Sequence, residues 1–297
     1  MKSIWSFWSK PFKEKKSTAW ASQKYHLFSW VLSVETAKRH FPQTVLFTDD
    51  EGARILVDTI GLEFDSVFTE LNTLHRYDPE WWAVGKIFTY LLQTEPFVHI
   101  DSDVFLWKPL PERMERAPLL AQNPESFEPF SSWYYPQKFD LLERLQGWIP
   151  QEIEWYKSLV RGQRAVCCGV FGGNRLDFIG HYAQQALDIL LHPANQPVWT
   201  LLGGDNILIE QYVLSACIEY HKGRASSPFS DIRVEFLFDS AEAAFNPASS
   251  TQAGYTHLIG GAKNNKYSLD RLERRVQKDY PQYYERCVRF FEAEIRR

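Results

Sequence analysis

The sequence has few cysteines and no long apolar run. It contains four cysteines among 297 residues, and no two of them are spaced C-x-x-C, so a disulfide framework is not expected. No segment approaches the ~18 apolar residues of a membrane-spanning helix. The apolar stretch at residues 4–8 is too short for a signal-peptide core. These absences predict buried thiols in a reducing compartment, and we expect a cytoplasmic protein.

The sequence also lacks an excess of positive charge. Its net charge is -4, which argues against a general nucleic-acid binder. Hydrophobic residues make up 44% of the chain, enough for one large domain or two small ones. Aromatic residues reach 15%, with 11 Trp. Such a surplus is frequent in proteins that stack rings on sugars, although most of these rings are expected to fill the core.

The first ~110 residues alternate short apolar strands with helical patterns. Strands are expected at residues 2–8, 44–48, 64–71 and 97–107, and helices at about 27–41, 51–60 and 84–92. This alternation predicts an α/β fold with a mostly parallel central sheet flanked by helices. In such sheets ligands bind beyond the carboxyl ends of the strands.

The rest of the chain reads as a continuation of the same domain, followed by a helical tail. Residues 108–165 are irregular, and a strand at 165–171 and helices at 178–191 and from about 205 follow. The last segment, 268–297, is helical and charged, and Pro281 interrupts it. It is expected to pack on the domain with a solvated charged face. A weaker alternative is peripheral contact with an anionic membrane.

Two carboxylates, Asp101 and Asp103, lie in the otherwise apolar run 97–107. Buried aspartates are costly unless they are paired or bind a cation. On extended backbone, residues two apart point to the same side. The pair is therefore predicted to hold one divalent cation, and the alternative is a pair of solvated turn aspartates.

A second candidate segment is the strand and loop from Tyr255 to Lys263. His257 offers an imidazole, which would suit Mn²⁺ better than Mg²⁺ as a third ligand. Gly260 and Gly261 would let the backbone approach a diphosphate, and Lys263 would supply a positive charge. Taken alone, His257 fits an ordinary strand histidine better than a metal ligand.

Together, Asp101-x-Asp103 and His257-x-x-Gly260-x-x-Lys263 resemble the signature of retaining glycosyltransferase family 8. The resemblance implies a GT-A fold over residues 1–263, with a nucleotide-binding half at about 1–110 and an acceptor half at about 111–263. Residues 264–297 would be a helical extension of the same domain. It also implies Asp101, Asp103 and His257 as ligands of Mn²⁺ or Mg²⁺. The family usually continues with Pro-Trp after the lysine, where this chain has two asparagines.

Three further segments are similar to GT-A enzymes. Lys86 opens a helix and would face the nucleotide, with a plain surface lysine as the alternative. Gly172 and Gly173 resemble the segment that lines the donor-sugar pocket, or else form a glycine turn after a strand. In the stretch Gly203-Gly204-Asp205-Asn206, Asp205 would bind sugar hydroxyls and Asn206 would lie near the anomeric carbon. Asp205 could also be a helix N-cap.

The expected function is therefore metal-dependent transfer of a sugar, most simply a hexose, from a nucleotide diphosphate sugar to an acceptor hydroxyl, with retention. The acceptor would be a carbohydrate or a lipid-linked molecule. A departing phosphate that takes the acceptor's proton would fit the lack of a convincing base; Asp205 and Glu210 are the carboxylates to test as nucleophiles. Two alternatives stay open: a phosphatase of the haloacid dehalogenase type, and a non-catalytic nucleotide- or carbohydrate-binding protein on a GT-A scaffold.

Overall fold

The computed structural model describes residues 1–14, 20–126, 137–159, 161–202 and 205–296. The chain forms two units, each of which is built from segments that are discontinuous in sequence. The first contains Met1–Gly85, Val98–Leu110 and Ser250–Arg297, and the second contains Lys86–Phe97 and Pro111–Ser249. The fold is α/β, with a mostly parallel central sheet flanked by helices, as the sequence predicts.

The strands of the first unit follow the expected βα alternation. In the sheet the order is β3-β2-β1-β4, and β1 pairs in parallel with β2, as β2 does with β3. A separate antiparallel pair joins β5 to β9. The bounds are β1 (Lys2–Phe7), β2 (Thr44–Thr48), β3 (Ser66–Phe68), β4 (Phe97–Ile100), β5 (Val104–Leu106) and β9 (Tyr255–His257).

Helices surround these strands. They are α1 (Ser9–Lys13), α2 (Gln23–Ala37), α3 (Asp50–Ala53), the π-helix η1 (Arg54–Thr59), the 3-10 helices η2 (Glu70–Arg76) and η5 (Gly260–Lys263), α12 (Pro247–Ala253), α13 (Lys266–Asp279) and α14 (Pro281–Ile295). All five residues of β2 are buried, which fits a strand covered on both faces. Trp5 Nε1 donates to Ser33 Oγ at 2.9 Å and ties β1 to α2.

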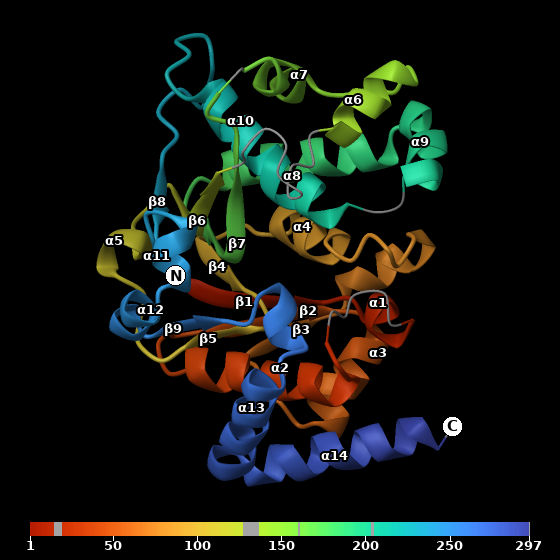
Figure 1. The fold of residues 1–297 in the computed structure, drawn as a ribbon, viewed down its shortest axis with the longest axis vertical. Coiled ribbons are helices and arrows are strands. Elements are labelled where there is room, and N and C mark those ends of the chain that lie inside the picture. The colour runs from red at the N-terminus through yellow and green to blue at the C-terminus, as the bar shows by residue number, and fades with distance from the viewer. Residues whose placement is uncertain (15–19, 127–136, 160, 203–204, 297) are drawn as a thin grey trace. The chain divides into compact units, whose positions relative to one another are not determined.

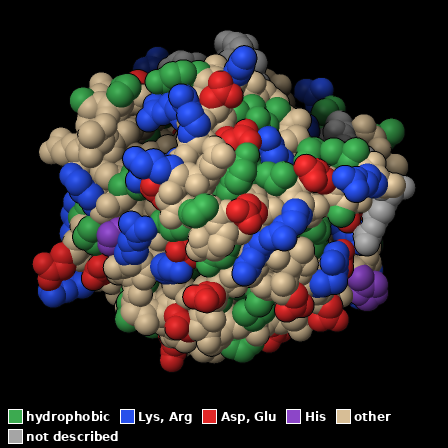
Figure 2. Space-filling view, turned by 90° about the horizontal axis from the view of Figure 1, so that it is seen from below, with side chains coloured by type: hydrophobic (Ala, Val, Ile, Leu, Met, Phe, Trp, Pro, Cys, Tyr) green, Lys and Arg blue, Asp and Glu red, His purple; other side chains and the backbone are tan. Residues whose placement is uncertain are grey.

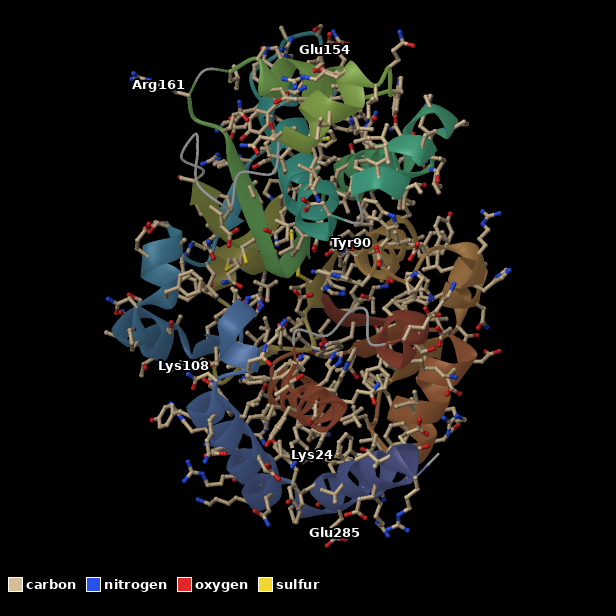
Figure 3. The ribbon with its side chains drawn as sticks, turned by 45° about the vertical axis from the view of Figure 1, so that its right-hand side comes forward. Lys24, Tyr90, Lys108, Glu154, Arg161 and Glu285 are labelled. Carbon is tan, nitrogen blue, oxygen red and sulfur yellow. The ribbon has the colours of Figure 1, made fainter. Side chains whose placement is uncertain are left out.

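The C-terminal helices α13 and α14 pack against α2, which lies between them and the strands in Figure 1. Tyr284 stacks on Phe28 with ring centroids 5.2 Å apart. Lys24, labelled in Figure 3, forms an ion pair with Glu273 at 3.0 Å. These contacts bury the apolar face of the tail within the first unit.

The outer face of this region is charged. Figure 2 looks onto the side where α13 and α14 lie and shows Lys and Arg interspersed with Asp and Glu. Among the described residues, no helix is both long enough and apolar enough to cross a membrane. Peripheral membrane contact through 268–297 stays a prediction.

The second unit is built on β6 (Leu119–Ser126), which pairs antiparallel with β7 (Arg164–Gly173) and parallel with β8 (Val234–Phe236). Its helices are α4 (Val84–Leu91), which starts at the unit boundary, α5 (Glu112–Glu115), α6 (Gln137–Arg144), α7 (Gln151–Lys157), α8 (Leu176–Leu191), the 3-10 helix η3 (Pro193–Asn195), α9 (Gln196–Leu202), the π-helix η4 (Leu208–Tyr212), α10 (Val213–His221) and α11 (Ala241–Phe245).

Aromatic side chains form much of the core of the second unit. Tyr90 on α4, labelled in Figure 3, has its ring 5.0 Å from that of Phe171 and 6.5 Å from that of Tyr182. Tyr182 donates its hydroxyl to the carbonyl of Glu210 at 2.6 Å. The expectation that most aromatic residues fill the core holds for these rings, which are almost fully buried.

Two strand predictions are wrong in part. The run 97–107 is not one strand: β4 ends at Ile100, and β5 begins at Val104. Asp101 and Asp103 lie in the turn between them, so their approach does not depend on the two-residue period of a strand. The segment 64–71 forms a strand only at Ser66–Phe68, because the chain then enters the 3-10 helix η2.

Candidate metal and phosphate site

The turn between β4 and β5 is held by hydrogen bonds to its backbone. The Val104 N–H donates to the Asp101 carbonyl at 3.0 Å, which closes the turn. Ser33 on α2 donates its hydroxyl to the same carbonyl at 2.8 Å. Because the main chain is fixed on both sides, the Asp101 and Asp103 carboxylates are held at the carboxyl end of β4.

Pairing of β5 with β9 brings His257 to this turn. Val104 lies opposite His257 in the antiparallel register, and the Leu258 N–H donates to the Asp103 carbonyl at 3.0 Å. As a result, one ligand atom from each of Asp101, Asp103 and His257 lies within 4.8 Å of the other two. The structure therefore brings the three predicted metal ligands together.

Lys263 reaches the same cluster. Its Nζ lies 2.6 Å from Asp103 Oδ2, and His257 Nε2 lies 3.4 Å from Asp103 Oδ1. Burial alone would raise the pKa of the Asp103 carboxyl, but Lys263 and His257 outweigh it and hold the pKa below its usual range. Asp103 is therefore an ionised ligand at neutral pH, with one oxygen already facing a cation.

The loop before Lys263 has room for a ligand beside its backbone. Gly260 has φ 53°, a conformation that favours glycine, and a Cβ added at Gly260 or Gly261 would meet no atom of the described residues within 4 Å. The backbone conformation therefore accounts for glycine at 260, whereas contacts with the described residues do not account for glycine at 261. The Ala21 N–H donates to the Lys263 carbonyl at 3.1 Å, which anchors the end of this loop.

Two histidines that the sequence analysis did not single out support the cluster. His99 Nδ1 lies 3.6 Å from Asp101 Oδ1, and its Nε2 lies 2.9 Å from Ser6 Oγ. His26 Nε2 lies 3.4 Å from the hydroxyl of Ser102. Burial, helped by the charge of Lys263, lowers the pKa of His26 to about 3, so this imidazole is neutral. The sequence could have indicated His99, because it precedes Asp101 by two residues. No sequence pattern indicates His26.

The remaining predicted site residues belong to the second unit. Lys86 is buried, and its Nζ lies 2.5 Å from Glu210 Oε1 and donates to the Cys168 carbonyl at 3.3 Å. The alternative of a plain surface lysine is therefore wrong. Lys86 lies out of phase with the apolar residues of α4, which favoured a surface position. No local pattern indicates that a carboxylate from a distant helix pairs with it.

Asp205 caps the helical segment that contains Glu210. Its Oδ1 accepts the Leu208 N–H at 3.1 Å, and its Oδ2 lies 3.2 Å from Lys138 Nζ. The N-cap expected for Asp205 is thus present, and Asn206 beside it is buried. Gly203 and Gly204 lie outside the described residues.

Gly172 and Gly173 are the last residues of β7. They pair with Leu120 and Leu119 of β6. Gly173 has φ 137°, and a Cβ there would lie 2.2 Å from the Pro118 carbonyl oxygen. Close backbone packing therefore accounts for the glycine at 173. The alternative of a glycine turn after the strand is wrong in its place, because both glycines still belong to β7.

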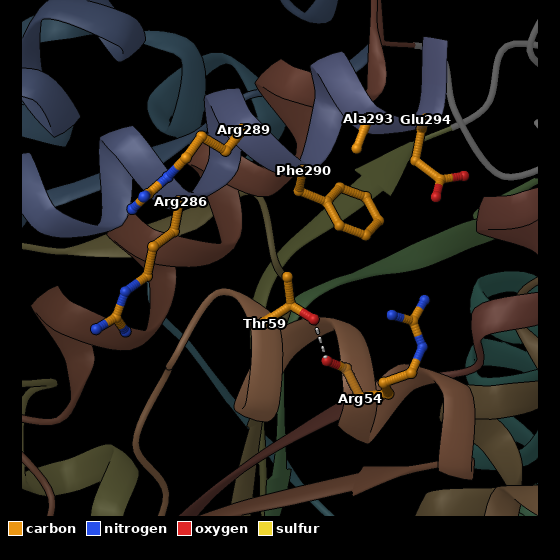
Figure 4. A pocket seen from close by; sticks show the side chains of 7 residues that line it. All are labelled: Arg54, Thr59, Arg286, Arg289, Phe290, Ala293 and Glu294. Atoms are coloured by element: carbon orange, nitrogen blue, oxygen red, sulfur yellow. Dashed lines mark hydrogen bonds between the residues drawn. The ribbon is translucent and has the colours of Figure 1, made fainter. Parts of the chain in front are cut away.

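A pocket of about 440 Å³ lies elsewhere in the first unit, between η1 and α14 (Figure 4). It is lined by Arg54, Thr59, Arg286, Arg289, Phe290, Ala293 and Glu294. None of the residues predicted for the metal and phosphate site contributes to it.

A family model matches almost the whole chain. The model of DUF6734, described as a family of unknown function, matches residues 1–290. No curated protein matches the chain significantly.

Proposed function

The chain belongs to the family DUF6734, and we propose from its site that it is a metal-dependent glycosyltransferase. It would move a sugar from a nucleotide diphosphate sugar to an acceptor hydroxyl, with retention at the anomeric carbon and on a GT-A scaffold. The observation that carries the proposal is the convergence of Asp101, Asp103, His257 and Lys263 at the end of β4. Residues far apart in sequence meet there in the combination that a cation and a diphosphate require.

The donor set fits a divalent cation. Asp101 and Asp103 offer carboxylate oxygens and His257 offers an imidazole nitrogen, a combination that suits Mn²⁺ better than Mg²⁺. When bound, the cation would supply positive charge that stabilises a leaving diphosphate. Ser33 holds the Asp101 main chain by a hydrogen bond, and His99 Nδ1 lies 3.6 Å from the Asp101 carboxylate, so groups outside the ligand set lie against it.

Lys263 is suited to hold the diphosphate. Its ammonium group lies at the ligand cluster, at the end of the loop whose glycines leave space for phosphate oxygens. In the ligand-free chain Asp103 compensates its charge. A bound diphosphate would offer Lys263 a second anionic partner, and the positive charge would then favour departure of the leaving group.

For the donor sugar, the proposal rests on the resemblance. Asp205 and Asn206 would orient the donor sugar, as the resemblance implies, and Lys138 and the Leu208 N–H already fix the Asp205 carboxylate. Lys86, paired with Glu210, would hold the helical segment that carries them. The bond from the anomeric carbon to the diphosphate would break and a bond to the acceptor oxygen would form, while the departing phosphate oxygen takes the acceptor's proton.

The test is a thermal-shift screen of nucleoside diphosphates and nucleotide sugars, with and without Mn²⁺, followed by turnover of each hit. Because ligands that bind only the native state raise its stability, a Mn²⁺-dependent shift would identify the donor. Asp103→Asn and His257→Gln should abolish the shift and the turnover. Asp58→Asn, which changes an exposed aspartate of the same unit, should leave both unchanged.

Three results would contradict the proposal. Turnover that is indifferent to chelator, or that survives in Asp103→Asn, would remove the metal site from the reaction. Release of phosphate from simple esters without turnover of nucleotide sugars would favour the phosphatase alternative. Nucleotide diphosphate binding with no turnover of any nucleotide sugar would favour the binding protein.

A further inference from the structure

A second cluster of metal-ligating side chains lies in the second unit, within a group of helices. It consists of Glu152 on α7, His181 on α8 and His221, the last residue of α10. Glu152 and His221 are buried, and the His181 side chain is about one quarter exposed, at 26%. None of these residues takes part in the proposed sugar transfer.

The three ligand atoms form a nearly equilateral triangle. His181 Nε2 lies 3.0 Å from Glu152 Oε1, His221 Nε2 lies 3.4 Å from the same oxygen, and the two nitrogens are 3.2 Å apart. Tetrahedral zinc with ligand bonds of about 2.0–2.1 Å places neighbouring ligand atoms about 3.3 Å apart. The triangle therefore has the dimensions of one face of a zinc coordination tetrahedron.

Hydrogen bonds alone account poorly for this triangle. An imidazole N–H can point along only one edge, so two protons cannot satisfy three edges with good geometry. If both Nε2 atoms donate to Glu152, two N–H groups converge on one oxygen, and their nitrogens, 3.2 Å apart, have no hydrogen bond between them. A cation above the triangle would instead attract one lone pair from each of the three atoms.

His221 is held in an orientation suited to binding a metal through Nε2. Its Nδ1 lies 2.8 Å from the hydroxyl oxygen of Ser227, which also accepts the Phe229 N–H at 3.0 Å. A hydroxyl oxygen has two lone pairs, so it can accept from both donors. When Nδ1–H donates to Ser227, Nε2 keeps its lone pair for the cluster, which is the usual outer-shell arrangement of a metal-binding histidine.

Aromatic rings enclose the cluster. The ring of Phe229 lies 5.2 Å from that of His181 and 5.1 Å from that of His221, and the ring of Phe178 lies 6.3 Å from that of His221. This apolar surround weakens competition from water on the buried side. The partly exposed His181 leaves one side accessible, where a water or another small ligand could take the fourth position.

We propose that Glu152, His181 and His221 form a zinc site that joins α7, α8 and α10. Two imidazoles and one carboxylate are a typical zinc donor set with an open fourth position. Zinc would bind here independently of the proposed transferase activity, because the cluster shares no residue with the Asp101–Asp103–His257 group.

The test is zinc titration of the full-length protein after chelator treatment, in competition with a chromophoric chelator. One tight equivalent is expected. Because outer-shell changes alone cost about 10–100-fold in affinity, loss of a ligand in His221→Gln or Glu152→Gln should cost at least about 100-fold. Ser227→Ala keeps all three ligands and should weaken binding by about 10–100-fold. Cobalt should give the visible absorption of a low-symmetry site in the wild type and lose it in His221→Gln.

Two controls separate this site from other histidines and from the first cluster. His75→Gln changes an exposed histidine and should leave zinc affinity unchanged, as should Asp103→Asn. The proposal is overturned if the chelator-treated wild type binds no zinc. It is also overturned if His221→Gln and Glu152→Gln retain full zinc affinity while circular dichroism shows that they are folded. A loss of zinc affinity in His75→Gln or Asp103→Asn as large as the loss in those two variants would overturn it as well.

Discussion

The two clusters that could hold a metal differ in the charge and origin of their ligands. The first, Asp101–Asp103–His257, has two carboxylates on one turn and an imidazole from the neighbouring strand, with Lys263 against one carboxylate. The second, Glu152–His181–His221, has two imidazoles and one carboxylate from three helices.

This difference in ligand chemistry gives the two clusters different metal preferences. Oxygen-rich ligands suit Mg²⁺ and Mn²⁺, whereas imidazoles suit zinc. The first cluster also contains a competing cation, Lys263, which favours transient binding that depends on an anionic ligand. In the second cluster no such ammonium group is paired with the carboxylate among the described residues, which favours resident metal.

The largest expected effect is on activity. Asp103→Asn should lower Mn²⁺-dependent transfer by on the order of 10³-fold or more, since a cation that stabilises leaving-group charge contributes several kcal/mol. The same variant should bind zinc as the wild type does. Initial rates with each nucleotide sugar check the loss of activity, and zinc titrations check that zinc affinity is unchanged. An equally large loss of transfer activity and of zinc affinity would show that the clusters are not independent.

The buried ion pair of the second unit should dominate its stability. Lys86→Met leaves Glu210 buried without its cation and should lower the free energy of unfolding by about 3–5 kcal/mol. Urea unfolding measures this loss. The double variant Lys86→Met/Glu210→Leu should recover most of it, because both charges of the pair are then absent. A double variant no more stable than Lys86→Met would contradict this reasoning.

Lys263→Met should change the affinity of the first cluster for Mn²⁺ and its affinity for a nucleoside diphosphate in opposite directions. Removing the ammonium group from Asp103 should raise Mn²⁺ affinity in the absence of nucleotide by roughly tenfold or more, since hydrogen bonds to charged groups contribute about 1.5–3 kcal/mol. Affinity for the nucleoside diphosphate should fall by a similar factor. Calorimetry separates the two; a loss of affinity for both would mean that Lys263 serves only to position the loop.

His26 in the first unit should make the stability of the protein depend on pH. His26 has a folded pKa of about 3, below its unfolded value near 6.5. Between these values the unfolded chain binds the additional proton, so His26 lowers stability as pH falls from about 6.5, by up to about 1.4 kcal/mol per pH unit. Above pH 7 it has no effect.

His26→Gln should flatten this part of the stability curve, as urea unfolding midpoints measured between pH 7 and pH 4 would show. His40→Gln, which changes a histidine in the turn after α2, is the matched control. An unchanged slope in His26→Gln would mean that other groups determine the loss of stability in acid.

Local patterns predicted much of the first unit. The strand Thr44–Thr48 was predicted with the bounds that the structure has, because its apolar run ends at two aspartates. The two π-helices were not predictable, because a shift in hydrogen-bond register leaves no clear trace in composition. The turn at Asp101 was missed because Val and Phe on both sides favour a strand.

The sequence by itself determined the α/β class and the candidate ligands of the first cluster. Those ligands sit in short motifs whose residue types and spacing follow from the chemistry of a cation and a diphosphate. Only the tertiary structure decided that Lys86 is buried against Glu210 and that Glu152, His181 and His221 meet. These residues lie on separate helices, and their approach depends on how the helices pack, which no local spacing encodes.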